Sequence, residues 1–109
     1  MNLDRVFADV NSEQLKAILL MVASRVEGFS PGDVDQLCAD VAALELDDDV
    51  LLEPEISFCG VALPFVVDVF KDAEGALEVV FLLAPDLRAM VEDAACAVVG
   101  RSAMRSIVA

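Results

Sequence analysis

Two apolar stretches separated by a short polar turn indicate a β-hairpin in the second half of the chain. Residues 61–70 and 77–83 are rich in Val, Leu and Phe, which suit a pleated, buried surface. The turn between them contains Gly75, and glycine readily adopts the left-handed conformation that a tight hairpin loop needs. Because both strands are so apolar, we expect the rest of the chain to supply helices that cover this hairpin.

The positions of the charges in the two strands favour one register. A three-residue loop over residues 73–75 pairs Asp72 with Ala76. One face is then wholly apolar, with the pairs Val69–Val79, Val67–Phe81 and Phe65–Leu83. The other face holds the pairs Phe70–Glu78, Asp68–Val80 and Val66–Leu82. A four-residue loop would place a charge on each face, and register follows the hydrophobic pattern, so the three-residue loop is predicted.

Capping residues and helical spacing predict helices on both sides of the hairpin. A short helix is expected over residues 2–8, and a longer one begins at Asn11 or Ser12 and ends at Gly28. A third helix begins after Ser30, with Pro31 in its first turn, and stops by residue 46. The last predicted helix runs from residue 85 to about residue 100, and residues 101–108 can resume as an amphipathic turn.

Residues 50–52 and 56–59 can each add a short strand, separated by the break at Pro54. Gly60 and Pro64 suggest a bulge and an edge position in the first strand of the hairpin. The chain is therefore expected to form one α+β domain over residues 1–109. Helices would pack on one face of a small antiparallel sheet centred on the hairpin, in the order α-α-β-β-α.

The chain is unusually apolar for its size. Hydrophobic residues make up 58% of it, against about 45–50% in typical domains. This excess suggests a homodimer or a hydrophobic partner, because a small monomer buries only part of such surface. The candidate oligomer surface is the apolar part of the mixed hairpin face, namely Val66, Phe70, Val80 and Leu82. The alternative is that helices of the same chain cover these residues as core.

The formal net charge is −13, and it is distributed unevenly. No Lys or Arg occurs between residues 26 and 70, so this span should repel nucleic acid and anionic membranes and attract basic proteins. The candidate partner-binding residues are Asp35, Asp40, Asp47, Asp48, Asp49, Glu53 and Glu55. Two alternatives stay open: a solvated acidic loop and a calcium site, although the EF-hand spacing is missing.

Several classes of site are disfavoured by the residues that the chain lacks. The chain has no His, Tyr or Trp, which argues against catalytic triads, common metal sites and base-stacking platforms. Asp68 and Glu78 are the acids placed inside strands, and they fit a solvated or interface face better than acid–base catalysis. Cys38, Cys59 and Cys96 are expected to be buried, reduced thiols. We therefore expect no enzyme activity, no metal and no cofactor.

The apolar runs are too short to span a membrane, and no signal peptide is evident, so a cytoplasmic location is expected. The strand–turn–strand–helix order of residues 63–99 on a small acidic chain resembles the general appearance of type III secretion chaperones.

The leading hypothesis is an acidic, non-catalytic module that binds a basic protein, and a nucleic-acid-binding protein is one version of this partner. It would act as an inhibitor or nucleic-acid mimic, an immunity protein or a chaperone. The alternative is a homo-oligomeric structural or small-molecule-binding protein, with its pocket between helices and sheet.

Overall fold

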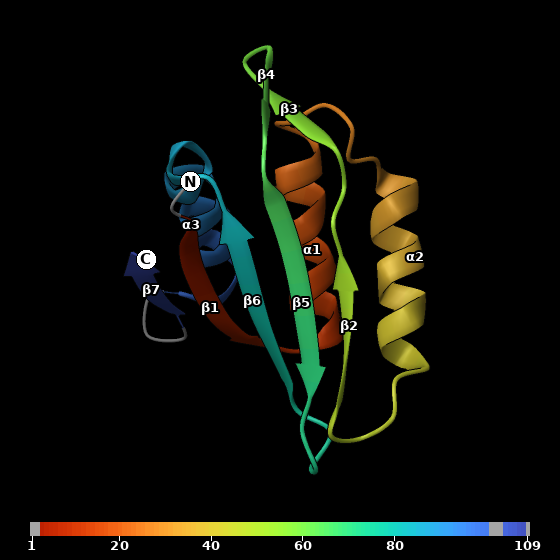
Figure 1. The fold of residues 1–109 in the computed structure, drawn as a ribbon. Coiled ribbons are helices and arrows are strands. Elements are labelled where there is room, and N and C mark those ends of the chain that lie inside the picture. Colours follow the sequence, from red (N-terminus) through yellow and green to blue (C-terminus); the bar gives the residue numbers. More distant parts are fainter. Residues whose placement is uncertain (1–2, 101–103, 109) are drawn as a thin grey trace.

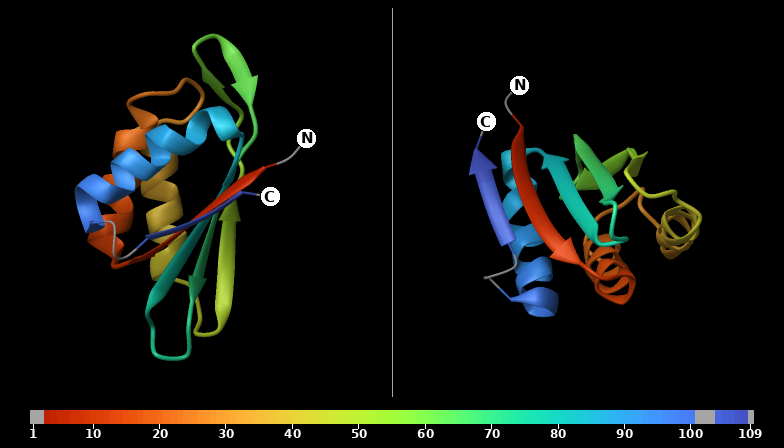
Figure 2. Two further views of the ribbon diagram at one scale, coloured as in Figure 1. Left: turned by 90° about the vertical axis from the view of Figure 1, so that its left-hand side faces the viewer. Right: turned by 90° about the horizontal axis from the view of Figure 1, so that it is seen from below.

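The structure is a computed structural model, and it describes residues 3–100 and the backbone of residues 104–108. A five-stranded antiparallel sheet carries three helices on one of its faces, and a separate two-stranded ribbon projects from one end (Figures 1 and 2). The elements follow one another as β1 (Asp4–Val10), α1 (Ser12–Ala23), α2 (Pro31–Ala42), β2 (Asp48–Leu52), β3 (Ile56–Phe58), β4 (Val61–Leu63), β5 (Phe65–Lys71), β6 (Leu77–Leu83), α3 (Pro85–Val99) and β7 (Met104–Val108). The α+β class with helices on an antiparallel sheet is confirmed.

The hairpin of β5 and β6 has the predicted register. The Asp72 amide donates to the Ala76 carbonyl at 2.9 Å, and Gly75 adopts a φ of +86°. The Asp72 carboxylate also accepts hydrogen bonds from the amides of Glu74 and Ala76 at 2.9 Å, which fixes the loop. All six predicted cross-strand pairs are present, from Phe65–Leu83 to Phe70–Glu78. The strands lie in the order β2-β5-β6-β1-β7, so the hairpin is flanked on both sides.

The prediction of a helix over residues 2–8 was wrong, because residues Asp4–Val10 form strand β1 beside β6. Its side chains alternate between the two faces: Val6, Ala8 and Val10 are buried, and Arg5 and Asp9 are exposed. The predicted order α-α-β-β-α therefore lacks strands at both ends.

The predicted amphipathic turn over residues 101–108 was also wrong where it is described. Met104–Val108 pair with β1 as strand β7, and residues 101–103 lie outside the described residues. Extended backbone at residues 104–108 is explained by this pairing with a strand almost a hundred residues earlier in the chain, which the local sequence does not indicate.

Reciprocal capping boxes start α1 and α2. Asn11 Oδ1 accepts from the Gln14 amide at 2.8 Å, and Gln14 Oε1 accepts from the Asn11 amide at 2.9 Å. Ser30 and Asp33 make the same exchange at the start of α2. Both helices are shorter than predicted, since α1 ends at Ala23 and α2 at Ala42.

The end of α2 is held by a charge from the central sheet. Lys71 Nζ, at the end of β5, donates to the carbonyl oxygens of Val41 at 2.8 Å and Leu44 at 3.0 Å. A cation is favourable at the negative end of a helix dipole, where carbonyl groups lack helical partners. This contact ties α2 to the sheet and fixes the loop that leads into β2.

The predicted short strands are present, but the predicted first strand of the hairpin over residues 61–70 is divided at Pro64 into β4 and β5. The edge position suggested by Pro64 was wrong, because β5 is paired with β2 on one side and β6 on the other. β3 and β4 form the two-stranded ribbon, which is attached to the body by a bridge between Glu27 and Ser57. Gly28, beside this bridge, has a φ of +88°, and a Cβ there would collide with the carbonyl oxygen of Glu55. Only glycine combines this conformation with so close an approach of two backbones.

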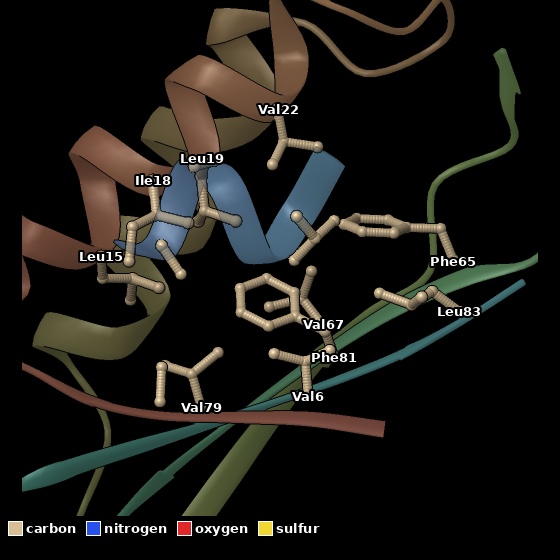
Figure 3. Packing of buried hydrophobic residues seen from close by; sticks show 14 of the residues in the cluster. Val6, Leu15, Ile18, Leu19, Val22, Phe65, Val67, Val79, Phe81 and Leu83 are labelled. Carbon is tan, nitrogen blue, oxygen red and sulfur yellow. The ribbon is translucent and has the colours of Figure 1, made fainter. Parts of the chain in front are cut away.

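The core fills the space between the helices and the inner face of the sheet (Figure 3). Phe65 and Phe81 lie at its centre, with ring centroids 6.2 Å apart, and Phe29 approaches Phe65 at 6.0 Å. Leu19 and Val22 of α1 point toward these rings, as do the aliphatic side chains of neighbouring strands. The large apolar content of this layer supplies the main stabilisation of the fold.

One ion pair lies at the edge of this core. Asp4 is 2% exposed, and its Oδ2 is 3.1 Å from an Nη atom of Arg88 on α3, which also contacts Glu92. This pair explains why a charged residue can occupy an inward position of β1, because a buried carboxylate needs a cationic partner.

Candidate functional site

The sheet face opposite the helices is not covered by any described element (Figure 2). The side chains that alternate with the core residues of β1, β2, β5 and β6 project from it. We call this surface the open face, and its residues are Arg5, Phe7, Asp9, Asp49, Leu51, Val66, Asp68, Phe70, Glu78, Val80 and Leu82. Registers across the four strands place these residues in rows, so their neighbours are defined by the backbone.

The four residues predicted as an oligomer surface, Val66, Phe70, Val80 and Leu82, all lie on the open face. Val66 is directly opposite Leu82, and Phe70 is 36% exposed. The alternative that helices of the same chain cover them was wrong, because the described helices pack on the other face.

Phe7 of β1 and the 55% exposed Leu51 of β2 extend this apolar group across the sheet. The sequence analysis did not include these two, because Phe7 had been placed in a helix and no register was predicted for the short strand at residues 50–52. An apolar group of this kind, bordered by charge, is a common feature of protein-binding surfaces.

Asp68 lies in the middle of this apolar group. Leu51 and Val80 are its direct cross-strand neighbours, and Val66 and Phe70 flank it along β5. Asp49 lies diagonally across on β2, at the typical spacing of about 7–8 Å between backbones. No backbone amide or basic side chain among the described residues donates a hydrogen bond to Asp68 Oδ1, which is shielded from solvent.

The surroundings of Asp68 make its charged form unfavourable. Burial, followed by a hydrogen bond with Asp49 and the negative charge of that carboxyl, raises the pKa of Asp68 from its ordinary 3.8 to about 6. A cation that binds here is stabilised, because its positive charge would compensate the Asp68 carboxylate, which no basic side chain of the described residues contacts.

The open face is predominantly negative. Over β1, β2, β5 and β6 it carries four acidic residues and one basic residue, a formal charge of −3. The acids are Asp9, Asp49, Asp68 and Glu78, and the base is Arg5. The structure thus brings together carboxylates from four strands, which the linear sequence separates.

The predicted acidic set does not form one compact patch. Asp35 and Asp40 are exposed on α2, where Asp35 Oδ1 is 3.5 Å from Lys16 Nζ. The others are divided between the two ends of β2, a strand that spans about 16 Å at 3.3 Å per residue. Asp47, Asp48 and Asp49 lie at its beginning, with Asp47 at a φ of +60°, and Glu53 and Glu55 follow its end.

Glu53 and Glu55 line a shallow cleft of about 430 Å³ beside the β3–β4 ribbon. Its other lining residues are Pro54, Ile56, Ala62, Leu63, Pro64 and Phe65. The space between helices and sheet, where a small-molecule carrier was expected to hold its ligand, is filled by the core.

Within residues 3–100, no group of three or more Cys, Asp or Glu side chains is arranged to hold a metal ion. Asp68 and Glu78 share the open face as predicted, two cross-strand pairs apart along the hairpin.

The expectation of buried cysteines was wrong for Cys59, which is exposed at the tip of the β3–β4 ribbon, and Cys38 and Cys96 are partly exposed. Cys59 adopts a φ of +52° because the two-residue tip needs left-handed backbone. Burial raises the pKa of the Cys38 thiol, which lowers its reactivity.

Comparison of the chain with protein families, curated proteins and solved structures found no match. Among the described helices, none has the length and apolar character needed to cross a bilayer.

Proposed function

We propose that this protein is a non-catalytic protein-binding module that engages a basic surface of another protein. The observation that carries this proposal is the open face, an uncovered sheet surface that combines apolar side chains with a formal charge of −3. Apolar contact would supply affinity, and the surrounding carboxylates would speed association with a basic partner and select against acidic ones.

Charge favours a different protein over a second copy of the same chain. Two open faces stacked on each other would bring like charges together in an interface of reduced dielectric constant, which opposes association. A basic partner instead compensates Asp49 and Asp68. This partner chemistry suits an inhibitor that mimics nucleic acid, an immunity protein or a chaperone of a basic protein, and these remain versions of one proposal.

The test is affinity capture from a lysate of the cells that naturally produce the protein, followed by reconstitution with the purified partner. We expect a basic protein to bind at about 0.1 M salt and to be released near 1 M, where the Debye length falls from about 10 Å to about 3 Å. Two variants of equal charge serve as a matched pair. Asp9→Asn with Glu78→Gln alters the open face, and Asp35→Asn with Asp40→Asn alters α2.

We expect the open-face variant to lose most binding and the α2 variant to retain it. Equal loss in both variants would mean that only net charge matters. Loss in the α2 variant alone would place the partner on the helix layer and contradict the proposal.

A further inference from the structure

We propose that the open face recognises one arginine or lysine of its partner, which docks between Asp49 and Asp68 while apolar side chains of the partner cover the surrounding residues. This inference rests on the function proposed above and adds the chemistry by which the partner is selected. The occupant is therefore a protein segment with one cationic residue flanked by apolar residues.

Asp68 occupies the centre of an otherwise apolar part of the open face, with Leu51, Val80, Val66 and Phe70 on its four sides. A partner that covers these apolar residues must also cover the charge of Asp68. Docking without a cation would leave that carboxylate buried and uncompensated, which is strongly unfavourable.

Among the residues whose side chains the structure describes, no basic group compensates Asp68. The charged neighbours of Asp68 on the strands around it are Asp49 from β2 and Glu78 from β6, both acidic. The basic residue of the open face, Arg5, is on β1, opposite Leu82 rather than Asp68. Asp68 Oδ1 is shielded and receives no bond from a backbone amide or basic side chain of the described residues. A guanidinium, with its five donors, fits two neighbouring carboxylates well.

A second copy of the chain and a neutral or acidic peptide both fit this surface less well than a cationic segment. A second copy would present Asp49 and Asp68 to its own counterparts, which adds repulsion instead of compensation. A neutral or acidic peptide would cover the apolar residues but would leave the two carboxylates without a cation. The partner chemistry is therefore cationic at its centre and apolar around it.

The arrangement also makes binding depend on pH. Asp68 takes up a proton near pH 6, whereas docking of a cation favours its charged form. Within residues 3–100, Asp49, Glu78, Asp9 and Arg5 are the titratable and charged groups that share this surface with it. Affinity should therefore fall as pH decreases through 6, by about tenfold for each unit by which the partner lowers the Asp68 pKa.

The test is selection of binding peptides from a displayed random library with the wild-type protein as bait, followed by affinity measurement with synthetic peptides. We expect enriched peptides to contain one Arg or Lys between apolar residues. Replacing that residue by glutamine, or introducing Asp68→Asn, should weaken binding by about tenfold or more. The two changes together should cost little more than either alone, because they remove the same contact.

Asp40→Asn, on α2, is the matched control that removes an equal charge, and it should change affinity by less than about twofold. Enriched peptides that bind equally well to Asp68→Asn and wild type would overturn this inference but leave the proposed function standing. Selection of peptides without cationic residues, or of none at all, would overturn both. Unchanged affinity between about pH 7.5 and pH 5 would refute the protonation effect and with it the role assigned to Asp68.

Discussion

Asp68→Asn should make the folded protein more stable at neutral pH, although it removes a carboxylate from the proposed binding surface. In the wild type, this carboxylate must carry its charge among Leu51, Val66, Phe70 and Val80. Asparagine has nearly the same shape and no charge, so the substitution removes the unfavourable desolvation and the repulsion from Asp49.

The magnitude follows from the pKa. A rise from 3.8 to about 6 corresponds to about 3 kcal/mol for a group fully shielded from water. Asp68 is partly exposed, and solvent screening reduces the expected gain to about 1 kcal/mol. The folded state binds more protons than the unfolded state between these two pKa values. The penalty is therefore complete above about pH 6 and disappears as pH falls toward about 4.

Urea unfolding of the wild type and Asp68→Asn between about pH 4.5 and pH 8 measures this difference directly. Asp93→Asn, an exposed site on α3, is the control for the general benefit of lowering a net charge of −13. We expect a difference of about 1 kcal/mol for Asp68→Asn at neutral pH that shrinks on acidification, and less than about 0.5 kcal/mol for the control. An equal, pH-independent gain in both variants would refute the reasoning, since only net charge would then be involved.

Four further substitutions test the fold that presents the open face. Gly28→Ala should cost about 3 kcal/mol or more, because positive φ and a backbone collision combine. Gly60→Ala, at a φ of +79° in open space, should cost only about 1–2 kcal/mol, and equal urea midpoints would contradict this account. Lys71→Met should cost about 1–2 kcal/mol and speed amide hydrogen exchange in the last turn of α2; unchanged exchange would show that the ammonium does not hold that turn. Arg88→Met should cost about 3 kcal/mol by thermal unfolding, and adding Asp4→Asn should recover part of that loss; no recovery would mean that the ion pair is not the cause.

Local rules were sufficient for the hairpin and for the short strand β2, and they failed for β1 and β7. The register of β5 and β6 was predictable because Gly75 marks the turn and Asp68 and Glu78 must share a face. β1 was misassigned because Phe7 is apolar on the open face, which hides the alternation of Val6 and Ala8 on the inner face.

Two further features of the fold depend on contacts between residues that are distant in the sequence. Asp4 is an inward charge that makes sense only through Arg88, which lies far along the chain. The pairing of β7 with β1 joins the two ends of the described chain, and neither segment carries a local signal for it.

The binding surface was predictable in part for a similar reason. The apolar residues Val66, Phe70, Val80 and Leu82 were identified because they follow from the register of one hairpin. The acidic residues were chosen from a span without basic residues, so the prediction grouped Asp35 of α2 with Glu53 at the end of β2. The neighbours of each residue on a sheet face are set by the strand order and the register. No local pattern indicates that β1 pairs with β6 or which residues of β2 lie opposite those of β5.

The most direct test of the binding surface is an NMR titration of the isotope-labelled protein with a peptide that carries one arginine between apolar residues. The account predicts saturable amide shifts concentrated in β2, β5 and β6, with the largest changes around Asp68, and small changes in the three helices. Shifts confined to α2, or to the cleft beside Glu53 and Glu55, would contradict the assignment of the open face as the surface that binds a basic partner.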